Sequence, residues 1–140
     1  MLSNRSIPRA TVIPVLAYPD VNQAAAWLCN AFGFRVRLRI GDHRVQLNVG
    51  DGAVIVREMR LNEVNTAPGG GTLGHYSGRG RRRPLQPGKD HGARITQEPV
   101  THPYGERQYN ADDCAGYSWT FSQSVADIHP EEWGGTAEQL

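Results

Sequence analysis

Residues 13–34 read IPVLAYPDVNQAAAWLCNAFGF, and this stretch decides the fold. It opens with a β-branched and apolar run that predicts a strand, and Pro14 within the run favours an edge position or a bulge. Asp20 or Asn22 can then cap a helix. Apolar residues recur in that helix at helical spacing and form one face: Ala24, Trp27, Leu28, Ala31 and Phe32. Gly33 follows where a left-handed residue commonly ends a helix.

Three strands are expected after this helix. Residues 34–40 alternate between apolar side chains and arginines, and residues 45–49 alternate in the same way. The alternation predicts that the apolar side chains of the first of these strands share one face: Phe34, Val36, Leu38 and Ile40. A Gly-Asp-Gly turn at 50–52 leads into a short apolar strand at 53–56. The predicted order is therefore strand, helix, strand, strand, strand.

The other end of the chain repeats only part of this order. Residues 93–100, 107–111 and 117–122 predict three strands. The strand and helix that should precede them are replaced by TAPGGGTLGHYSGRGRRRPLQPGK at 66–89, which has no periodicity and many glycines, prolines and arginines. Such a composition predicts a disordered basic loop.

A chain of 140 residues has the length of one domain. We expect a single domain over residues 1–140, with a first module at about 9–60 and a second at about 90–134. The irregular basic segment 66–89 lies between the two modules.

Three segments of the chain resemble a known family. The stretch 13–34 resembles the opening strand and helix of the vicinal-oxygen-chelate superfamily, which includes glyoxalases, bleomycin-resistance proteins and related dioxygenases. HGARITQEPVTHPYGERQYNADDCAGYSWTFSQ at 91–123 is similar to its closing three strands, and DIHPEEWGG at 127–135 to the tail of its resistance-protein branch. The resemblance implies an α+β fold of two βαβββ modules whose mixed sheet curls around a concave cleft. The second module is expected to be disrupted at residues 71–89.

The irregular segment can be tested against the genetic code. GRGRRRPLQPGK at 78–89, read one base downstream with free codon choice, can encode VEDVDAHYNRAK, which is a strand end, a turn and the start of an amphipathic helix. The same shift over residues 72–77 permits the β-rich reading HSVTIA. Our hypothesis is that two compensating frame changes lie near Gly71 and Lys89.

The resemblance also implies a metal site, which this chain does not match. Enzymes of the superfamily hold a divalent ion with His, Glu or Gln on inward-facing strand positions, where it acts as a Lewis acid on vicinal oxygens. When the four ligand positions of the superfamily are transferred to this chain, they fall near Ile13, at about Val56, in the irregular segment and at Thr120. Glu58, two residues beyond Val56 and on the same face, is a single substitute. One ligand in four does not make a site, so we expect no metal and no cofactor.

The histidines and cysteines suggest no alternative chemistry. The histidines show no close ligand spacing and are expected on surfaces or loops: His43, His75, His91, His102 and His129. Cys29 lies on an apolar helix face, where a thiol is usually inert packing. The glycines at 69–71 lack the lysine and hydroxyl residue of a phosphate loop. We therefore expect no catalytic residue.

Charge and composition exclude other partners. The net charge of +1 gives no general attraction to nucleic acid, and the basic run 79–83 has no interleaved aromatic residue for base stacking. No apolar stretch approaches the roughly 20 residues that a membrane helix needs. The amino terminus lacks the apolar core of a secretory signal, and two cysteines are too few for a disulfide framework. These features predict a cytoplasmic protein with no nucleic-acid or membrane partner.

The last strand predicts the lining of the cleft. Its aromatic residues share one face and its hydroxyl residues the other. Because Thr120 matches an inward position, Thr120 and Ser118 are expected to look into the cleft. Trp119 and Phe121 are then expected in the core.

The preceding strand supplies further candidates. Arg107 and Tyr109 share a face, and a guanidinium beside an aromatic ring suits a planar, anionic or oxygen-rich ligand. The equal alternative is that Arg107 pairs with Asp112 or Glu106 to hold the hairpin. Tyr104 is expected to close the rim.

The prediction is a metal-independent protein that binds or sequesters an antibiotic-like small molecule, with Glu58 among its ligand-binding residues. As in the related resistance proteins, a homodimer is expected. The alternative function is a divalent-metal-dependent lyase, isomerase or dioxygenase-like enzyme that uses a degenerate site around Glu58.

Overall fold

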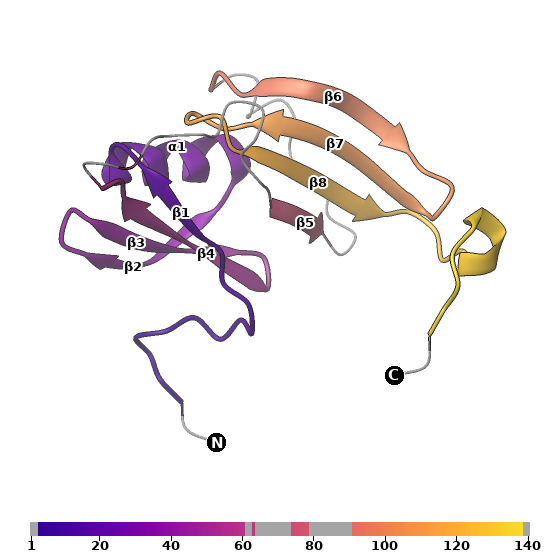
Figure 1. The fold of residues 1–140 in the computed structure, drawn as a ribbon, viewed down its shortest axis with the longest axis horizontal. Helices are drawn as coiled ribbons and strands as arrows, with labels where there is room; N and C mark the ends of the chain where they lie inside the picture. The colour runs from indigo at the N-terminus through magenta and orange to yellow at the C-terminus, as the bar shows by residue number, and fades with distance from the viewer. Residues whose placement is uncertain (1–2, 61–62, 64–73, 79–90, 139–140) are drawn as a thin grey trace.

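The protein is described here by a computed structural model covering residues 3–60, 63, 74–78 and 91–138 (Figure 1). The described residues form two four-stranded sheets and one α-helix, followed by a short 3-10 helix near the carboxyl terminus, η1 at Pro130–Trp133. In the described chain, no helix is both long and apolar enough to cross a membrane. The basic run 79–83 lies outside the described residues.

The first sheet confirms the predicted order of elements. Its elements are β1 (Val15–Tyr18), α1 (Val21–Phe32), β2 (Arg35–Ile40), β3 (Arg44–Val49) and β4 (Gly52–Glu58). The strands lie in the order β1-β4-β3-β2, with β1 parallel to β4 and the other neighbours antiparallel. The strand after Pro14 is therefore an edge strand, as a proline at this place predicts.

Local sequence signals fix both ends of α1. The side chain of Asp20 accepts a hydrogen bond from the backbone N–H of Gln23 at 3.0 Å, which is an N-cap. Gly33 has a φ of 75°, and its N–H donates to the carbonyl of Cys29 at 3.0 Å. Both predicted caps are confirmed.

The predicted alternation of residues 34–40 holds for only half of β2. Val36 lies opposite Leu47, which is on the core face, but the register then shifts and Leu38 lies opposite Gln46. Arg37 is the extra residue, so this is a β-bulge. The prediction that Leu38 and Ile40 share a face with Val36 is wrong, because a bulge reverses the alternation beyond it.

The second sheet repeats the arrangement of the first. It contains β5 (Gly74–Gly78), β6 (Arg94–Thr101), β7 (Glu106–Asp112) and β8 (Ser118–Ser124) in the order β5-β8-β7-β6. β5 runs parallel to β8, as β1 does to β4. The expectation that the sequence as written lacks this opening strand is wrong for residues 74–78. The helix expected from the shifted frame would fall within residues 79–90, which are outside the described residues.

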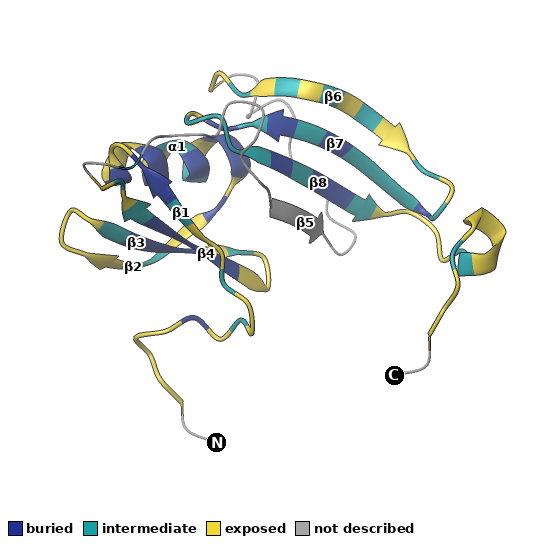
Figure 2. Cartoon of the chain, in the orientation of Figure 1, coloured by how far each residue is buried: buried dark blue, intermediate teal, exposed yellow. Residues whose placement is uncertain are grey.

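Aromatic side chains join the two sheets. Phe32 of α1 packs against Phe121 with ring centroids 4.8 Å apart, and Phe34 packs against Trp119 at 5.3 Å. Burial is concentrated in α1, β3 and β4, and it alternates along β7 and β8 (Figure 2). The predicted core positions of Trp119 and Phe121 are confirmed, and the α+β class with two similar sheets is as expected.

Candidate functional site

One face of the second sheet is lined by polar side chains. Gln108 lies opposite Ser122 and Asn110 lies opposite Thr120, and side chains directly opposite each other on antiparallel strands share a face. The other face of the same strands carries core residues, among them Ala111. We call the outward side of β6–β8 the polar face; its residues are Gln97, Glu106, Gln108, Asn110, Asp112, Ser118, Thr120 and Ser122.

The centre of the polar face is a hydrogen-bonded relay across three strands. The hydroxyl of Thr120 donates to Oδ1 of Asn110 at 2.9 Å, and Nδ2 of Asn110 donates to Oε1 of Gln97 at 3.3 Å. At one end of the hairpin, the hydroxyl of Ser118 donates to the carboxylate of Asp112 at 2.9 Å. These bonds hold the side chains in fixed orientations, which reduces the entropy that a ligand would have to overcome.

The other end of the polar face is organised around Glu106. The hydroxyl of Ser122 donates to its carboxylate, and so does the side-chain amide of Gln108 at 3.5 Å. The phenol of Tyr104 reaches the same group of residues, because it donates to Oε1 of Gln108 at 3.4 Å.

Tyr104 belongs to an aromatic corner at this end of the sheet. Its ring stacks on His102 with an angle of 4° and centroids 4.9 Å apart, and it meets Trp133 of η1 edge-on at 5.3 Å. Trp133 is 42% exposed. The polar face therefore ends at a rim that presents aromatic surface to solvent.

The turn between β7 and β8 fixes the hairpin register. Asp113 accepts hydrogen bonds at 2.8 and 3.1 Å from the backbone N–H groups of Ala115 and Tyr117, and its other oxygen accepts from the indole N–H of Trp119 at 3.0 Å. Asp113 is buried, and burial raises the pKa of its carboxyl although these bonds oppose the shift.

The structure brings together three of the six predicted site residues. Ser118 and Thr120 lie on the polar face, and Tyr104 lies at its rim. Tyr109 is on the opposite face, 8% exposed and stacked on Phe121 at 5.1 Å. The expectation that Tyr109 would line the same cleft as Thr120 does not agree with this placement, because an odd position on β7 pairs with an odd position on β8.

The other two predicted residues also lie apart from this site. Arg107 shares the face of Tyr109, and its guanidinium donates to Oγ1 of Thr101 at 2.9 Å. Glu58 ends β4 in the other sheet, in register with Tyr18. Gln108 and Asn110 were missed by the sequence analysis, although counting pairs back from the turn at 113–117 would have placed them opposite Ser122 and Thr120.

Two of the carried-over metal positions, Val56 and Thr120, offer poor ligands for a divalent ion. Val56 is fully buried in the core, and Thr120 offers a neutral hydroxyl that already donates to Asn110. The backbone of His75 on β5 lies in register with Thr120. Across the described chain, no group of three or more His, Cys, Asp and Glu residues is placed to hold a metal ion.

Neither cysteine is activated. Partial burial of the thiol and the nearby carboxylate of Asp113 raise the pKa of Cys114 to about 11, and burial also raises the pKa of Cys29. Because a thiolate is the nucleophilic form, both groups are poorly suited to nucleophilic chemistry near neutral pH.

Several solved structures share this fold. TioX from Micromonospora sp. ML1 is 29% identical, with a TM-score of 0.62 over 86% of this chain and 100% of that one. A glyoxalase/bleomycin resistance protein/dioxygenase from Nocardioides is 12% identical, with a TM-score of 0.60 over 100% of this chain and 92% of that one. Lactoylglutathione lyase from Agrobacterium tumefaciens is 18% identical, with a TM-score of 0.56 over 83% and 94%. No protein-family model matches the sequence, and no curated protein is significantly similar to it.

Proposed function

Because this chain belongs by its fold to the vicinal-oxygen-chelate superfamily, we propose that it binds an oxygen-rich, antibiotic-like small molecule on the polar face without a metal ion. The observation that carries the proposal is the relay of Thr120, Asn110 and Gln97 beside the aromatic rim. Hydroxyl and amide groups both donate and accept hydrogen bonds, so they can match ligand carbonyl and hydroxyl groups.

The aromatic rim supports the same kind of ligand. The rings of Tyr104 and Trp133 offer flat apolar surface next to the polar relay, and aromatic pairs favour stacked or edge-on contact with a planar group. Binding sites for small molecules commonly combine apolar surface with a few fixed polar groups.

A matched pair of threonine substitutions tests the proposal. Isothermal titration calorimetry would use metal-free bleomycin and a planar aromatic peptide antibiotic as probes. Thr120→Val removes the hydroxyl of the relay and should weaken binding about tenfold, the cost of one hydrogen bond. Thr101→Val removes a hydroxyl on the other face and should leave affinity within about twofold. Equal affinities for both variants, or no binding of either probe, would contradict the proposal.

The alternative is a metal-dependent lyase, isomerase or dioxygenase-like enzyme. The backbone register of His75 with Thr120 favours it, because a residue type that can ligate a metal then lies beside one of the carried-over metal positions. Metal analysis of protein purified from cells grown with manganese, nickel and zinc separates the two functions. One divalent ion retained per chain would support the enzyme and overturn metal-free binding.

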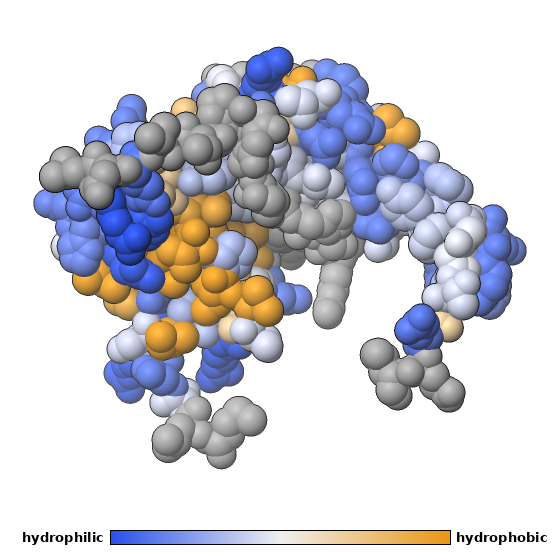
Figure 3. Space-filling model, viewed as in Figure 1, coloured by the Kyte–Doolittle hydropathy of each residue, from blue (hydrophilic) through white to orange (hydrophobic). Residues whose placement is uncertain are grey.

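We also propose a homodimer in which the first sheet lies at the interface. Val12 is 78% exposed, and Val15 and Ile40 lie on the side of the first sheet away from α1, 44% and 39% exposed. Figure 3 shows apolar side chains gathered over the region of β1 and β4. Apolar surface of this kind commonly marks an association site. Light scattering should report a dimer that Val15→Lys dissociates, whereas Val125→Lys, at another exposed valine, should not.

The two cysteines bear on the cellular compartment of the protein. Both cysteines are free in the structure, with Cys114 on an exposed turn. Free thiols persist in reducing compartments, so we place the protein in the cytoplasm.

A further inference from the structure

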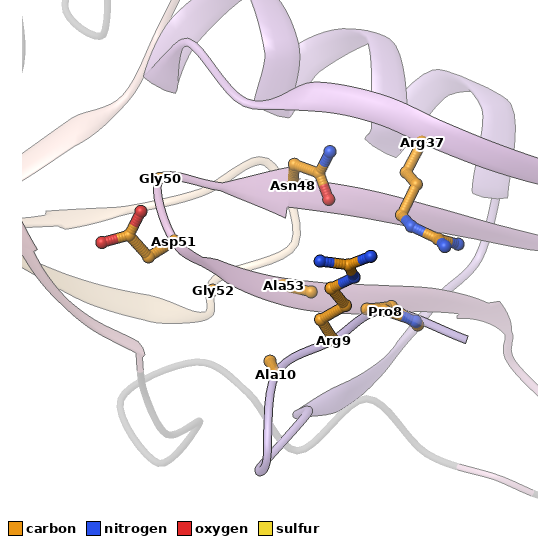
Figure 4. Close-up of a pocket in the computed structure, with 9 residues that line it drawn as sticks. All are labelled: Pro8, Arg9, Ala10, Arg37, Asn48, Gly50, Asp51, Gly52 and Ala53. Atoms are coloured by element: carbon orange, nitrogen blue, oxygen red, sulfur yellow. The ribbon is translucent and has the colours of Figure 1, made fainter. Parts of the chain in front are cut away.

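A hollow lies on the first sheet, apart from the polar face. It has a volume of about 270 Å³ and lies between the amino-terminal segment and the end of the β3–β4 hairpin (Figure 4). Its wall is formed by Pro8, Arg9, Ala10, Arg37, Asn48 and residues 50–53.

The amino-terminal segment is fastened to the sheet at this point. Nη2 of Arg37 donates to the carbonyl oxygens of Arg5 and Ile7 at 2.9 and 3.1 Å. Nε2 of Gln46 donates to the carbonyl of Ser6 at 2.8 Å, and Pro8 is buried. The hollow therefore has a fixed wall on the side of the segment.

The hollow carries excess positive charge. The acceptors that hold Arg37 are neutral: the carbonyls of Arg5 and Ile7, and Oε1 of Gln46 at 2.6 Å. These bonds use three of the five N–H groups of the guanidinium, and no carboxylate of the described residues forms a salt bridge with it. Figure 4 shows the guanidinium of Arg9 reaching across the sheet towards Asn48. Asp51 also lines the hollow, but Figure 4 shows its carboxylate at the turn, directed away from both guanidinium groups.

We propose that this hollow binds a small anion through a carboxylate or phosphate group held between Arg9 and Arg37. Two guanidinium groups in one hollow suit such oxyanions, because the planar fork of N–H groups matches their oxygens. The side-chain amide of Asn48 can donate a further hydrogen bond. At roughly 30 Å³ per water molecule, the volume equals about nine waters, which suits a compact metabolite better than an antibiotic.

Anion titrations with a charge-matched control test this site. Chemical-shift changes of the full-length protein would be followed with inorganic phosphate and, separately, with acetate. Saturable binding of either ion supports the site and identifies the group that it prefers. Arg9→Gln should weaken that binding about tenfold, because it removes a charge-assisted bond. Arg94→Gln removes an equal charge from the second sheet and should leave the dissociation constant unchanged.

Two results would overturn the inference. One is that neither ion binds, and the other is that Arg9→Gln and Arg94→Gln weaken binding equally, which would indicate only general attraction to a basic surface. Asn48→Leu adds a variant that keeps both arginines and should still weaken binding. Thr120→Val should leave anion binding unchanged, so failure of this site and failure of the polar face as a binding site are distinguishable.

Discussion

The phenol of Tyr18 donates to a carboxylate oxygen of Asp113 at 2.5 Å, joining the end of β1 to the turn between β7 and β8. A second bond links the same two parts of the chain, from the phenol of Tyr117 to the carbonyl of Ala17 at 2.9 Å. The two rings lie 5.1 Å apart. The first and second sheets are thus connected by a small buried polar cluster in addition to their aromatic packing.

Tyr18→Phe should lower the free energy of unfolding by about 1–3 kcal/mol, because it leaves a buried carboxylate short of one donor. Chemical denaturation measures the change. Tyr117→Phe is the matched control: it removes a phenol that donates to a backbone carbonyl at a half-buried position, and should cost about 1 kcal/mol or less. A larger loss in the control would show that the carboxylate is not the important acceptor.

Stability should also depend on the titration of Asp113. Burial raises the pKa of this carboxyl in the folded protein above its ordinary value of about 3.9. The folded state therefore binds the proton more tightly than the unfolded chain does. The stabilisation that results is complete below about pH 3.9 and is lost as the pH rises through the raised pKa.

The side chain introduced by Asp113→Asn does not titrate, so a comparison with the wild type isolates the pH dependence of stability that Asp113 causes. The free energy of unfolding of the wild type minus that of Asp113→Asn should fall as the pH rises from about 4, in urea denaturation at a series of pH values. A difference that instead grows with pH would mean that the hydrogen bonds to the carboxylate outweigh its burial.

Alanine substitutions at two glycines with nearly equal φ angles distinguish the cost of backbone strain from the cost of steric overlap. Gly105 has a φ of 87°, and a methyl group there would overlap the carbonyl of Ala126. Gly92 has a φ of 88° with open space around the same position. Gly92→Ala should cost about 1–2 kcal/mol from backbone strain alone. Gly105→Ala should cost about 1–3 kcal/mol more, measured by thermal unfolding. Equal losses would show that the loop after Ser124 moves aside without penalty.

The hypothesis of two compensating frame changes near Gly71 and Lys89 stays a prediction. The sequence of the coding DNA tests it. Sequencing across the codons for residues 66–91 should show a continuous frame that encodes a VEDVDAHY-like strand end and helix. A frame that encodes GRGRRRPLQPGK as written would reject the hypothesis and make the basic segment a real part of the second module.

The first sheet and α1 could be predicted because their signals are local. Asp20 and Gly33 mark the ends of the helix within a few residues, and caps act through neighbouring backbone groups. The bulge at Arg37 could not be predicted from the alternation of residues 34–40, because the register depends on the partner strand β3.

The site was harder to predict for the same reason. The hydroxyl face of β8 follows from alternation within one strand, so Ser118 and Thr120 were placed together. The side chains that accompany them come from β7, and choosing Gln108 and Asn110 over Arg107 and Tyr109 requires the pairing across the hairpin. Arg37 and the segment at residues 5–10 are distant in sequence, so no local pattern connects them.

The bulge gives β2 one residue more than its pairing with β3 requires. Arg37 has no cross-strand partner in β3, and the strand resumes regular pairing at Leu38. Deleting this residue would join Val36 directly to Leu38 in regular pairing, so residues 38–40 would keep their present partners and faces. The deletion would, however, remove the anchor of the amino-terminal segment. A one-residue deletion here should therefore be tolerated about as well as a substitution that removes the guanidinium group.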